Sequence, residues 1–134
     1  MSPGKTETLQ LMSASDIFAA RQKVRQWALE MEFSLVEQTK IVTAASELAR
    51  NTIQHGGGGT MIIAIVESGI RTGLRLTFED HGPGIADVEK AMSDRFTTAG
   101  GLGLGLSGSK RLMNQFEIES KVGQGTRVTV TRWK

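Results

Sequence analysis

Residues 79–85 read Glu-Asp-His-Gly-Pro-Gly-Ile, so that a carboxylate is followed at once by a tight glycine turn. Before this turn, residues 74–79 alternate between apolar and polar, which is the period-two pattern of a half-buried strand. Asp80 is therefore expected at the C-terminal end of a strand. Gly82 and Gly84 permit backbone torsions that a side chain would forbid, so a ligand could approach this turn closely.

A strand that ends in such a turn is more often a plain turn than a binding site. Other motifs in the same chain reverse this preference. They are, in chain order, Glu47-x-x-x-Asn51-x-x-x-His55, Gly101-x-Gly103-x-Gly105 and Gly123-x-Gly125-Thr126.

The first of these motifs falls on an expected helix. Residues 34–37 form a capping box, and the helix should run from residue 35 to Gly56, whose freedom at positive φ suits a helix end. Glu47, Asn51 and His55 are spaced by four residues, so they drift by only about 80° around the helix and project from one edge. A solvated polar face would explain such a triplet in isolation, whereas the glycine motifs favour a ligand-binding edge.

The order of elements predicts an α+β protein. We expect a two-layer α/β sandwich, with a mixed, mostly antiparallel sheet and helices mainly on one face. The expected strands are 6–12, 60–67, 74–80, 116–122 and 126–133, and the expected helices are 16–31, 35–56, 86–92 and 107–116. The order is not that of a Rossmann fold, and the glycines at 101, 103 and 105 lack the dinucleotide-binding spacing.

Composition excludes several classes of protein. With 134 residues, one domain over 1–134 is expected, with a loose terminus at 1–5. The formal charge of +2 is scattered, so no nucleic-acid partner is expected, and no membrane contact is expected because no apolar run could span a bilayer. The chain has no cysteine and only two histidines, which excludes thiolate chemistry and a histidine-rich metal site. A cytoplasmic location is expected.

The motifs supply what a nucleotide triphosphate requires. Asp80 can accept a hydrogen bond from the adenine amino group, with Thr126 beside it if the last hairpin lies next to strand 74–80. The glycines at 101, 103 and 105 lead into an expected helix, so backbone N–H groups could cradle phosphates. Asn51 offers an oxygen for Mg²⁺, and Glu47 could orient a nucleophile or accept its proton.

These motifs resemble the N, G1, G2 and G3 boxes of the GHKL (Bergerat) ATP-binding fold, which is shared by gyrase B, Hsp90, MutL and histidine kinases. Among its branches, the chain is similar to the small RsbT-type serine/threonine kinases of bacterial partner-switching systems, which belong to the stressosome. Three stretches carry this similarity, namely Ala45-Ser46-Glu47-Leu48-Ala49-Arg50-Asn51, Phe96-Thr97-Thr98-Ala99-Gly100-Gly101-Leu102-Gly103 and Lys110-Arg111-Leu112-Met113.

The resemblance implies a role for each matching residue. Glu47 would be the catalytic carboxylate, Asn51 would ligate Mg²⁺, Asp80 would hold adenine, and the loop around Phe96 would be a lid that closes over ATP. His55 is either part of the nucleotide site or a structural cap beside Gly56. The residues expected to contact the nucleotide are Asn51, His55, Asp80, Gly82, Gly84, Ile85, Arg95, Thr98, Gly101, Leu102, Gly103, Leu104, Gly105 and Thr126.

The resemblance also implies partners. Such kinases transfer the γ-phosphoryl group of ATP to a serine or threonine of an antagonist protein with a STAS domain, and a second role would be binding of a PP2C-type phosphatase or another downstream regulator. The chain has no room for a dimerisation helix pair or for the additional domains of gyrase-like ATPases, so the phospho-acceptor is expected on another protein. The alternatives are an anti-sigma-factor kinase that sequesters a sigma factor and a non-catalytic, nucleotide-gated binding module.

Overall fold

A computed structural model describes residues 4–92 and 106–134. Five strands form one sheet in the order β1-β2-β3-β5-β4. All four strand pairings are antiparallel, whereas the sequence indicated a mixed, mostly antiparallel sheet. The strands are β1 (Thr6–Leu11), β2 (Gly59–Ser68), β3 (Arg71–Asp80), β4 (Gln115–Lys121) and β5 (Gly125–Trp133).

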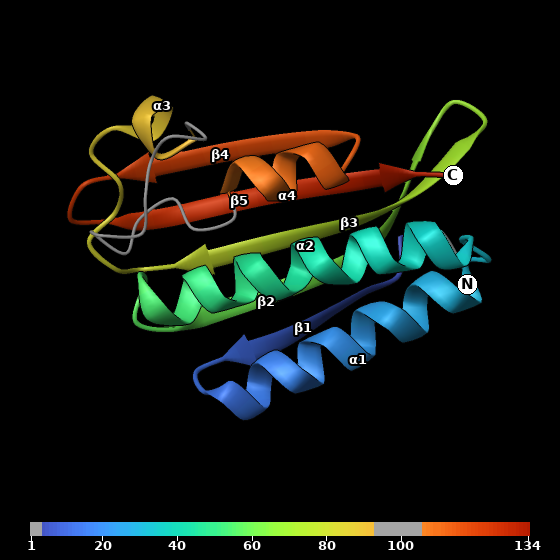
Figure 1. The fold of residues 1–134 in the computed structure, drawn as a ribbon, viewed down its shortest axis with the longest axis horizontal. Coiled ribbons are helices and arrows are strands. Elements are labelled where there is room, and N and C mark those ends of the chain that lie inside the picture. The colour runs from blue at the N-terminus through green and yellow to red at the C-terminus, as the bar shows by residue number, and fades with distance from the viewer. Residues whose placement is uncertain (1–3, 93–105) are drawn as a thin grey trace.

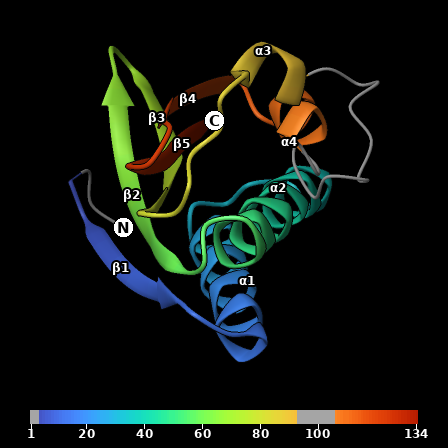
Figure 2. The ribbon, with the colours of Figure 1, turned by 90° about the vertical axis from the view of Figure 1, so that its left-hand side faces the viewer.

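The helices cover one face of this sheet. Helix α1 (Ala14–Glu30) and helix α2 (Leu35–Gln54) lie side by side on it, and the short helix α4 (Leu106–Leu112) packs against α2 (Figures 1 and 2). Helix α3 (Val88–Ala91) is a single turn. This two-layer arrangement confirms the α+β sandwich. Among the described helices, none combines the length and the apolar character that crossing a bilayer demands.

The start of α2 is fixed by the expected capping box. The Ser34 hydroxyl accepts a hydrogen bond from the Glu37 backbone N–H at 3.1 Å, and the Glu37 carboxylate accepts one from the Ser34 N–H at 3.3 Å. Ser13 occupies the corresponding position before α1 but makes no such side-chain contact. There the Asp16 carboxylate accepts a hydrogen bond from the Met12 N–H at 2.9 Å. The two helices therefore begin with caps of different strength.

The core lies between the helices and the sheet. Trp27 of α1 is 1% exposed and is among the largest fully buried side chains. One stripe of α2 faces the sheet, and its buried residues include Ile41, Ala44, Ala45, Leu48 and Thr52. Opposite it, β2 and β3 contribute alternate residues, namely Met61, Ile63, Ile65, Leu74, Leu76 and Phe78. The alternation therefore sends every second residue of the central strands towards α1 and α2.

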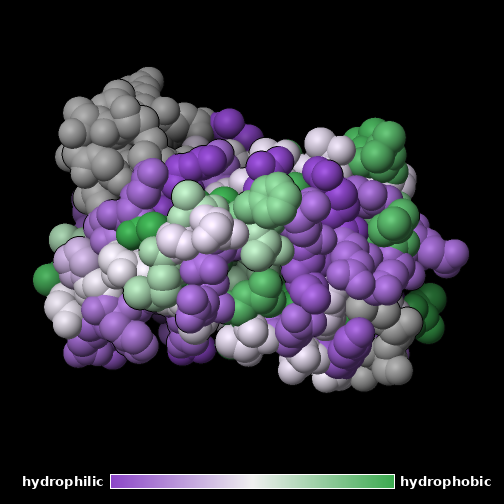
Figure 3. Space-filling model, turned by 90° about the horizontal axis from the view of Figure 1, so that it is seen from below, coloured by the Kyte–Doolittle hydropathy of each residue, from purple (hydrophilic) through white to green (hydrophobic). Residues whose placement is uncertain are grey.

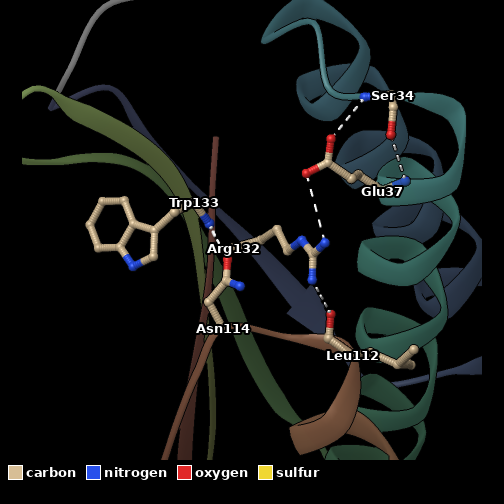
Figure 4. A network of polar contacts seen from close by, with 6 residues as sticks. All are labelled: Ser34, Glu37, Leu112, Asn114, Arg132 and Trp133. Atoms are coloured by element: carbon tan, nitrogen blue, oxygen red, sulfur yellow. Dashed lines mark hydrogen bonds and ion pairs between the residues drawn. The ribbon is translucent and has the colours of Figure 1, made fainter.

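Two expected helices are shorter than predicted. The stretch 86–92 is helical only over Val88–Ala91, and α4 ends at Leu112 rather than at Phe116, which belongs to β4. Asn114 explains the second difference, because its N–H donates to the Thr131 carbonyl at 2.9 Å and its side-chain oxygen accepts from the Trp133 N–H at 2.6 Å. The chain is thus tied to β5 two residues after α4 ends (Figure 4).

Arg132 holds three elements together at the same end of the sheet. Its guanidinium donates to the Leu112 carbonyl of α4 at 3.1 Å and lies 3.7 Å from the Glu37 carboxylate of α2 (Figure 4). The side chain is only 16% exposed. Strand β5 is therefore connected to both helices that border the candidate site described below.

Candidate functional site

A pocket opens where the C-terminal ends of α2 and β3 meet the start of β5, at one end of the molecule (Figure 1). The space that a water-sized molecule can occupy within it is about 30 Å³, so the walls must move apart to admit a larger ligand. Polar groups converge in it from all three elements, and apolar side chains form its walls. We call it the Asp80 pocket, and its lining consists of Leu48, Asn51, Thr52, His55, Phe78, Asp80, Ile85, Leu106, Thr126 and Val128.

Asp80 and Thr126 face each other at the base of this pocket. They are direct partners in the pairing of β3 with β5. The sequence predicted that Thr126 would lie beside Asp80 if the last hairpin lay next to β3, and it does. Each residue is only 8% exposed. One Asp80 carboxylate oxygen, Oδ1, accepts a hydrogen bond from the Gly82 N–H at 2.9 Å, which fixes the orientation of the carboxylate. Among the described residues, no hydrogen bond engages the other oxygen, Oδ2, which lies close to Gly56.

Glycine allows the segments around Asp80 to approach one another. A methyl group at Gly56, just after α2, would fall on the Asp80 side chain, and one at Gly82 would fall on the Gly56 backbone. Gly84 has a φ of +76°, and a methyl group there would strike the backbone of Lys121. The glycines of the 79–85 turn are therefore required by close packing as well as by backbone torsion.

A hydroxyl group that the sequence did not single out lies behind Thr126. The Ser120 hydroxyl is 2.8 Å from the Thr126 hydroxyl and accepts a hydrogen bond from the Ile85 N–H at 2.7 Å. Ser120 is on the inner side of β4, so the period-two alternation of that strand could have placed it next to the site. The contact with Thr126 follows from the hairpin of β4 and β5, in which the two residues are direct partners. Nothing in the sequence indicates the contact with Ile85, because the two residues are distant in the chain.

The polar edge of α2 enters the pocket through two of its three expected residues. Asn51 and His55 both line the Asp80 pocket. The His55 Nε2 lies 3.2 Å from the Gly84 carbonyl, and because a carbonyl only accepts, the ring nitrogen donates. His55 is also the C-cap residue of α2. The structure thus gives His55 a structural contact and a place in the pocket wall, and both expected roles are compatible with it.

Glu47, the third residue of that edge, does not line the Asp80 pocket. It lies in a groove between α1 and α2, where its carboxylate accepts a hydrogen bond from the Arg50 guanidinium at 2.8 Å. Its side chain is 37% exposed. We call this groove the α1–α2 groove, and its lining consists of Arg21, Arg25, Thr39, Val42, Thr43, Ser46, Glu47 and Arg50.

Seven of the expected nucleotide contacts cannot be placed. They fall within 93–105, outside the described residues, and are Arg95, Thr98, Gly101, Leu102, Gly103, Leu104 and Gly105. Ile85 is the one apolar wall residue that was predicted, whereas Leu48, Phe78 and Val128 were not, because they have the ordinary periodicity of core residues. These residues could have been identified as pocket walls only from their position around the buried Asp80 at the end of β3.

The chemistry of the pocket suits a flat, partly apolar ligand that carries an amino group. The walls can sandwich an aromatic ring, and the Asp80 carboxylate can accept the amino hydrogens. Among the described residues, no group of three His, Asp or Glu side chains could hold a metal ion. The Asn51 amide oxygen nevertheless fits Mg²⁺, which binds proteins through few ligands and takes the remainder from water and phosphate.

Comparison with known proteins agrees with this geometry. Residues 36–134 match the model of the family described as histidine kinase-, DNA gyrase B-, and HSP90-like ATPase. The chain is 46% identical to serine/threonine-protein kinase RsbT of Bacillus subtilis over 93% of its own length and 94% of that protein. It is 35% identical to the anti-sigma F factor of Thermoanaerobacter sp. (strain X514), over 85% of this chain and 82% of that protein.

Solved structures share the fold. The RsbU and RsbW domains of a Mycobacterium tuberculosis protein align with 99% of this chain and 33% of theirs, with a TM-score of 0.64 and 19% identity. The catalytic domain of histidine kinase ThkA aligns with 94% of this chain and 95% of its own, with a TM-score of 0.52 and 19% identity. Because the sequence matches extend over most of the chain, it belongs to the histidine kinase-, DNA gyrase B- and HSP90-like ATPase family, in its RsbT-type branch.

Proposed function

We propose that this chain is a serine/threonine protein kinase that binds ATP with Mg²⁺ and transfers the γ-phosphoryl group to a partner protein. The observation that carries the proposal is the buried Asp80–Thr126 pair at the base of an apolar-walled pocket. A buried carboxylate with one free oxygen is suited to the amino group of adenine. The match to RsbT, a serine/threonine-protein kinase, supports the same reaction.

In this proposal Asn51 holds the metal, and Mg²⁺ supplies charge neutralisation to the phosphates when bound. Glu47 orients the acceptor hydroxyl or takes its proton. Its place outside the Asp80 pocket is compatible with that role, because the acceptor arrives on another protein rather than in the base slot. The Arg50 contact must loosen when the acceptor hydroxyl arrives, and catalytic contacts often tighten only in the complex with substrate.

The α1–α2 groove is a suitable place for the partner to approach. Arg21 and Arg25 line it on one side and Glu47 on the other, together with hydroxyl groups. Lys23 of α1 does not line the groove and instead pairs with Glu7 of β1 at 3.2 Å. Seen from the α1 and β1 side, polar side chains dominate the surface, with a smaller apolar group near its middle (Figure 3). Phe18 of α1 is 63% exposed. Arginines beside an exposed aromatic residue are common in protein interfaces.

The RsbT-type resemblance indicates which partners to test first. They are an antagonist protein with a STAS domain as the phosphorylation substrate and a PP2C-type phosphatase as a second, regulatory partner, in a cytoplasmic stressosome pathway. The match to anti-sigma F factors favours a second candidate function, in which the chain sequesters a sigma factor. A non-catalytic, nucleotide-gated binding module remains the alternative of a different class.

Two measurements test the proposal. Nucleotide titration should show weaker ATP binding in Asp80→Asn and Asn51→Ala, and undiminished affinity in both would contradict the site. With γ-labelled ATP and a STAS-domain partner, Glu47→Gln should lose transfer while retaining ATP binding. Glu117→Gln, which alters an exposed carboxylate on β4, is the matched control and should retain transfer. Equal labelling by wild type and Glu47→Gln would contradict the catalytic assignment.

A further inference from the structure

Ser120 joins three segments around the base of the Asp80 pocket. Its hydroxyl lies 2.7 Å from the Ile85 N–H, 2.8 Å from the Thr126 hydroxyl and 3.2 Å from the Gly125 carbonyl. Ile85 follows the glycine turn after Asp80, and the other two residues begin β5. Ser120 itself does not line the Asp80 pocket, but it contacts two residues that do, Ile85 through its backbone N–H and Thr126 through its hydroxyl.

The number of protons in this cluster limits what Thr126 can offer to a ligand. The Ile85 N–H only donates, so Ser120 accepts there and has a single proton left to give. If that proton goes to the Gly125 carbonyl, Thr126 must donate to Ser120 and presents only lone pairs to the pocket. If it goes to Thr126, the Thr126 proton is free to point into the pocket. The contact with Thr126 has the better length for an O–H···O bond.

The ligand decides between these two arrangements. The edge of adenine presents an amino group, which donates, directly beside the ring nitrogen N1, which accepts. Asp80 accepts from the amino group, so N1 is turned towards the paired strand, where Thr126 is the direct neighbour of Asp80. A lone pair on Thr126 would face the lone pair on N1, whereas a proton on Thr126 would form a hydrogen bond.

We propose that Ser120 is a positioning residue for base selection, which gives its proton to Thr126 so that Thr126 donates to N1 of adenine, directly or through one water. This inference rests on the proposed function, because it requires adenine in the pocket. Guanine would present an oxygen to Asp80 and an N–H to the Thr126 proton, so both contacts would be mismatched. A site with buried polar groups discriminates strongly against such a ligand.

The test compares ATP with 1-deaza-ATP, in which N1 is replaced by a C–H group, on purified full-length protein. Wild type should bind 1-deaza-ATP about five- to tenfold more weakly than ATP, as expected for one neutral hydrogen bond. Ser120→Ala leaves the Thr126 hydroxyl free to rotate, so its affinity for ATP should fall part of the way towards its unchanged affinity for 1-deaza-ATP, and a wild-type ratio of the two affinities would contradict the role of Ser120. Thr126→Val, which leaves the Ser120 contacts with Ile85 and Gly125 in place, should bind both nucleotides equally.

A matched control separates positioning from general support of the fold. Thr131 lies on the same strand as Thr126, is 2% exposed and accepts a hydrogen bond from Arg75 at 3.2 Å. Thr131→Val should keep the wild-type ratio of the two affinities, even if it lowers stability.

Three outcomes would overturn the inference. If Ser120→Ala weakens ATP and 1-deaza-ATP by the same factor, Ser120 supports only the turn. If wild type binds the two nucleotides equally while Asp80→Asn loses ATP, the proposed function stands and the contact with N1 is absent. If wild type binds neither nucleotide, the proposed function fails, and this inference fails with it.

Discussion

Gly56→Ala should weaken ATP binding without replacing any side chain that is proposed to contact the nucleotide. The residue follows the C-cap of α2, and it lacks a positive φ, so alanine is compatible with its backbone. The added methyl group would lie 2.5 Å from the Asp80 Cβ and even closer to the carboxylate. Because the Cβ is fixed by the backbone of β3, rotation of the carboxylate alone cannot relieve the overlap. Asp80 and the end of α2 must separate.

The expected loss follows from the contact that Asp80 is proposed to make with the base. A hydrogen bond to a charged group contributes about 1.5–3 kcal/mol, so ATP affinity should fall about 10- to 150-fold. Overpacking of this kind also costs about 1–3 kcal/mol of the free energy of unfolding. Isothermal titration with ATP and Mg²⁺ measures the first effect and urea denaturation the second. Titration at a temperature well below the unfolding transition keeps the two effects separate.

The neighbouring glycine provides the control. Gly57 has a φ of +77°, and a methyl group there would have no heavy atom within 4 Å. Gly57→Ala should therefore cost about 1–2 kcal/mol of stability through backbone strain while ATP affinity remains that of wild type. Wild-type ATP affinity in Gly56→Ala, or an equal loss of affinity in both variants, would refute the argument that Gly56 is there to admit Asp80.

Three further predictions concern stability and are tested by urea or thermal denaturation. Ser34→Ala should cost about 1 kcal/mol by removing the α2 cap, whereas Ser13→Ala, which has no capping contact to lose, should cost less than about 0.5 kcal/mol; equal losses would contradict the assignment. Arg132→Met should cost about 1–3 kcal/mol, because the Leu112 carbonyl loses its charged donor, and an unchanged midpoint would count against that contact. Gly108→Ala within α4, where the methyl group meets nothing within 4 Å, should raise the melting temperature by about 2–4 °C, and a lower value would show a hidden close approach.

Periodicity predicted the parts of the fold in which one face is strongly apolar. The long helix expected over 35–56, the strands expected over 60–67 and 74–80, and the two-layer arrangement are all confirmed. The end of a short helix was predicted wrongly where a side-chain hydrogen bond outweighs the helix propensity of the local sequence. Asn114 is an example, because its amide bonds to β5 end a helical pattern that the local sequence would have allowed to continue.

The sequence predicted those residues of the candidate site that stand out by their type and their spacing in a motif. Asp80, Asn51 and His55 were identified from motif spacing, and the structure brings them into one pocket. The position of Glu47 was not predictable, because residues eight apart on a helix edge share a direction only approximately. Glu47 and His55 differ by about 80° around α2, which suffices to place them on opposite sides of the ridge between the pocket and the groove.

Strand register is the reason why so small a domain can build this site. Asp80 pairs with Thr126, and a shift of β5 by one residue would place Arg127 opposite Asp80 and turn the hydroxyl to the open face of the sheet. The register is held from two sides, since Val128 and Val130 must remain in the core and a side chain at Gly125 would strike the Asp80 backbone. The same alternation that buries the core of β5 thus delivers Thr126 to the Asp80 pocket. The packing of the sheet and the proposed recognition of the base therefore depend on the same strand register.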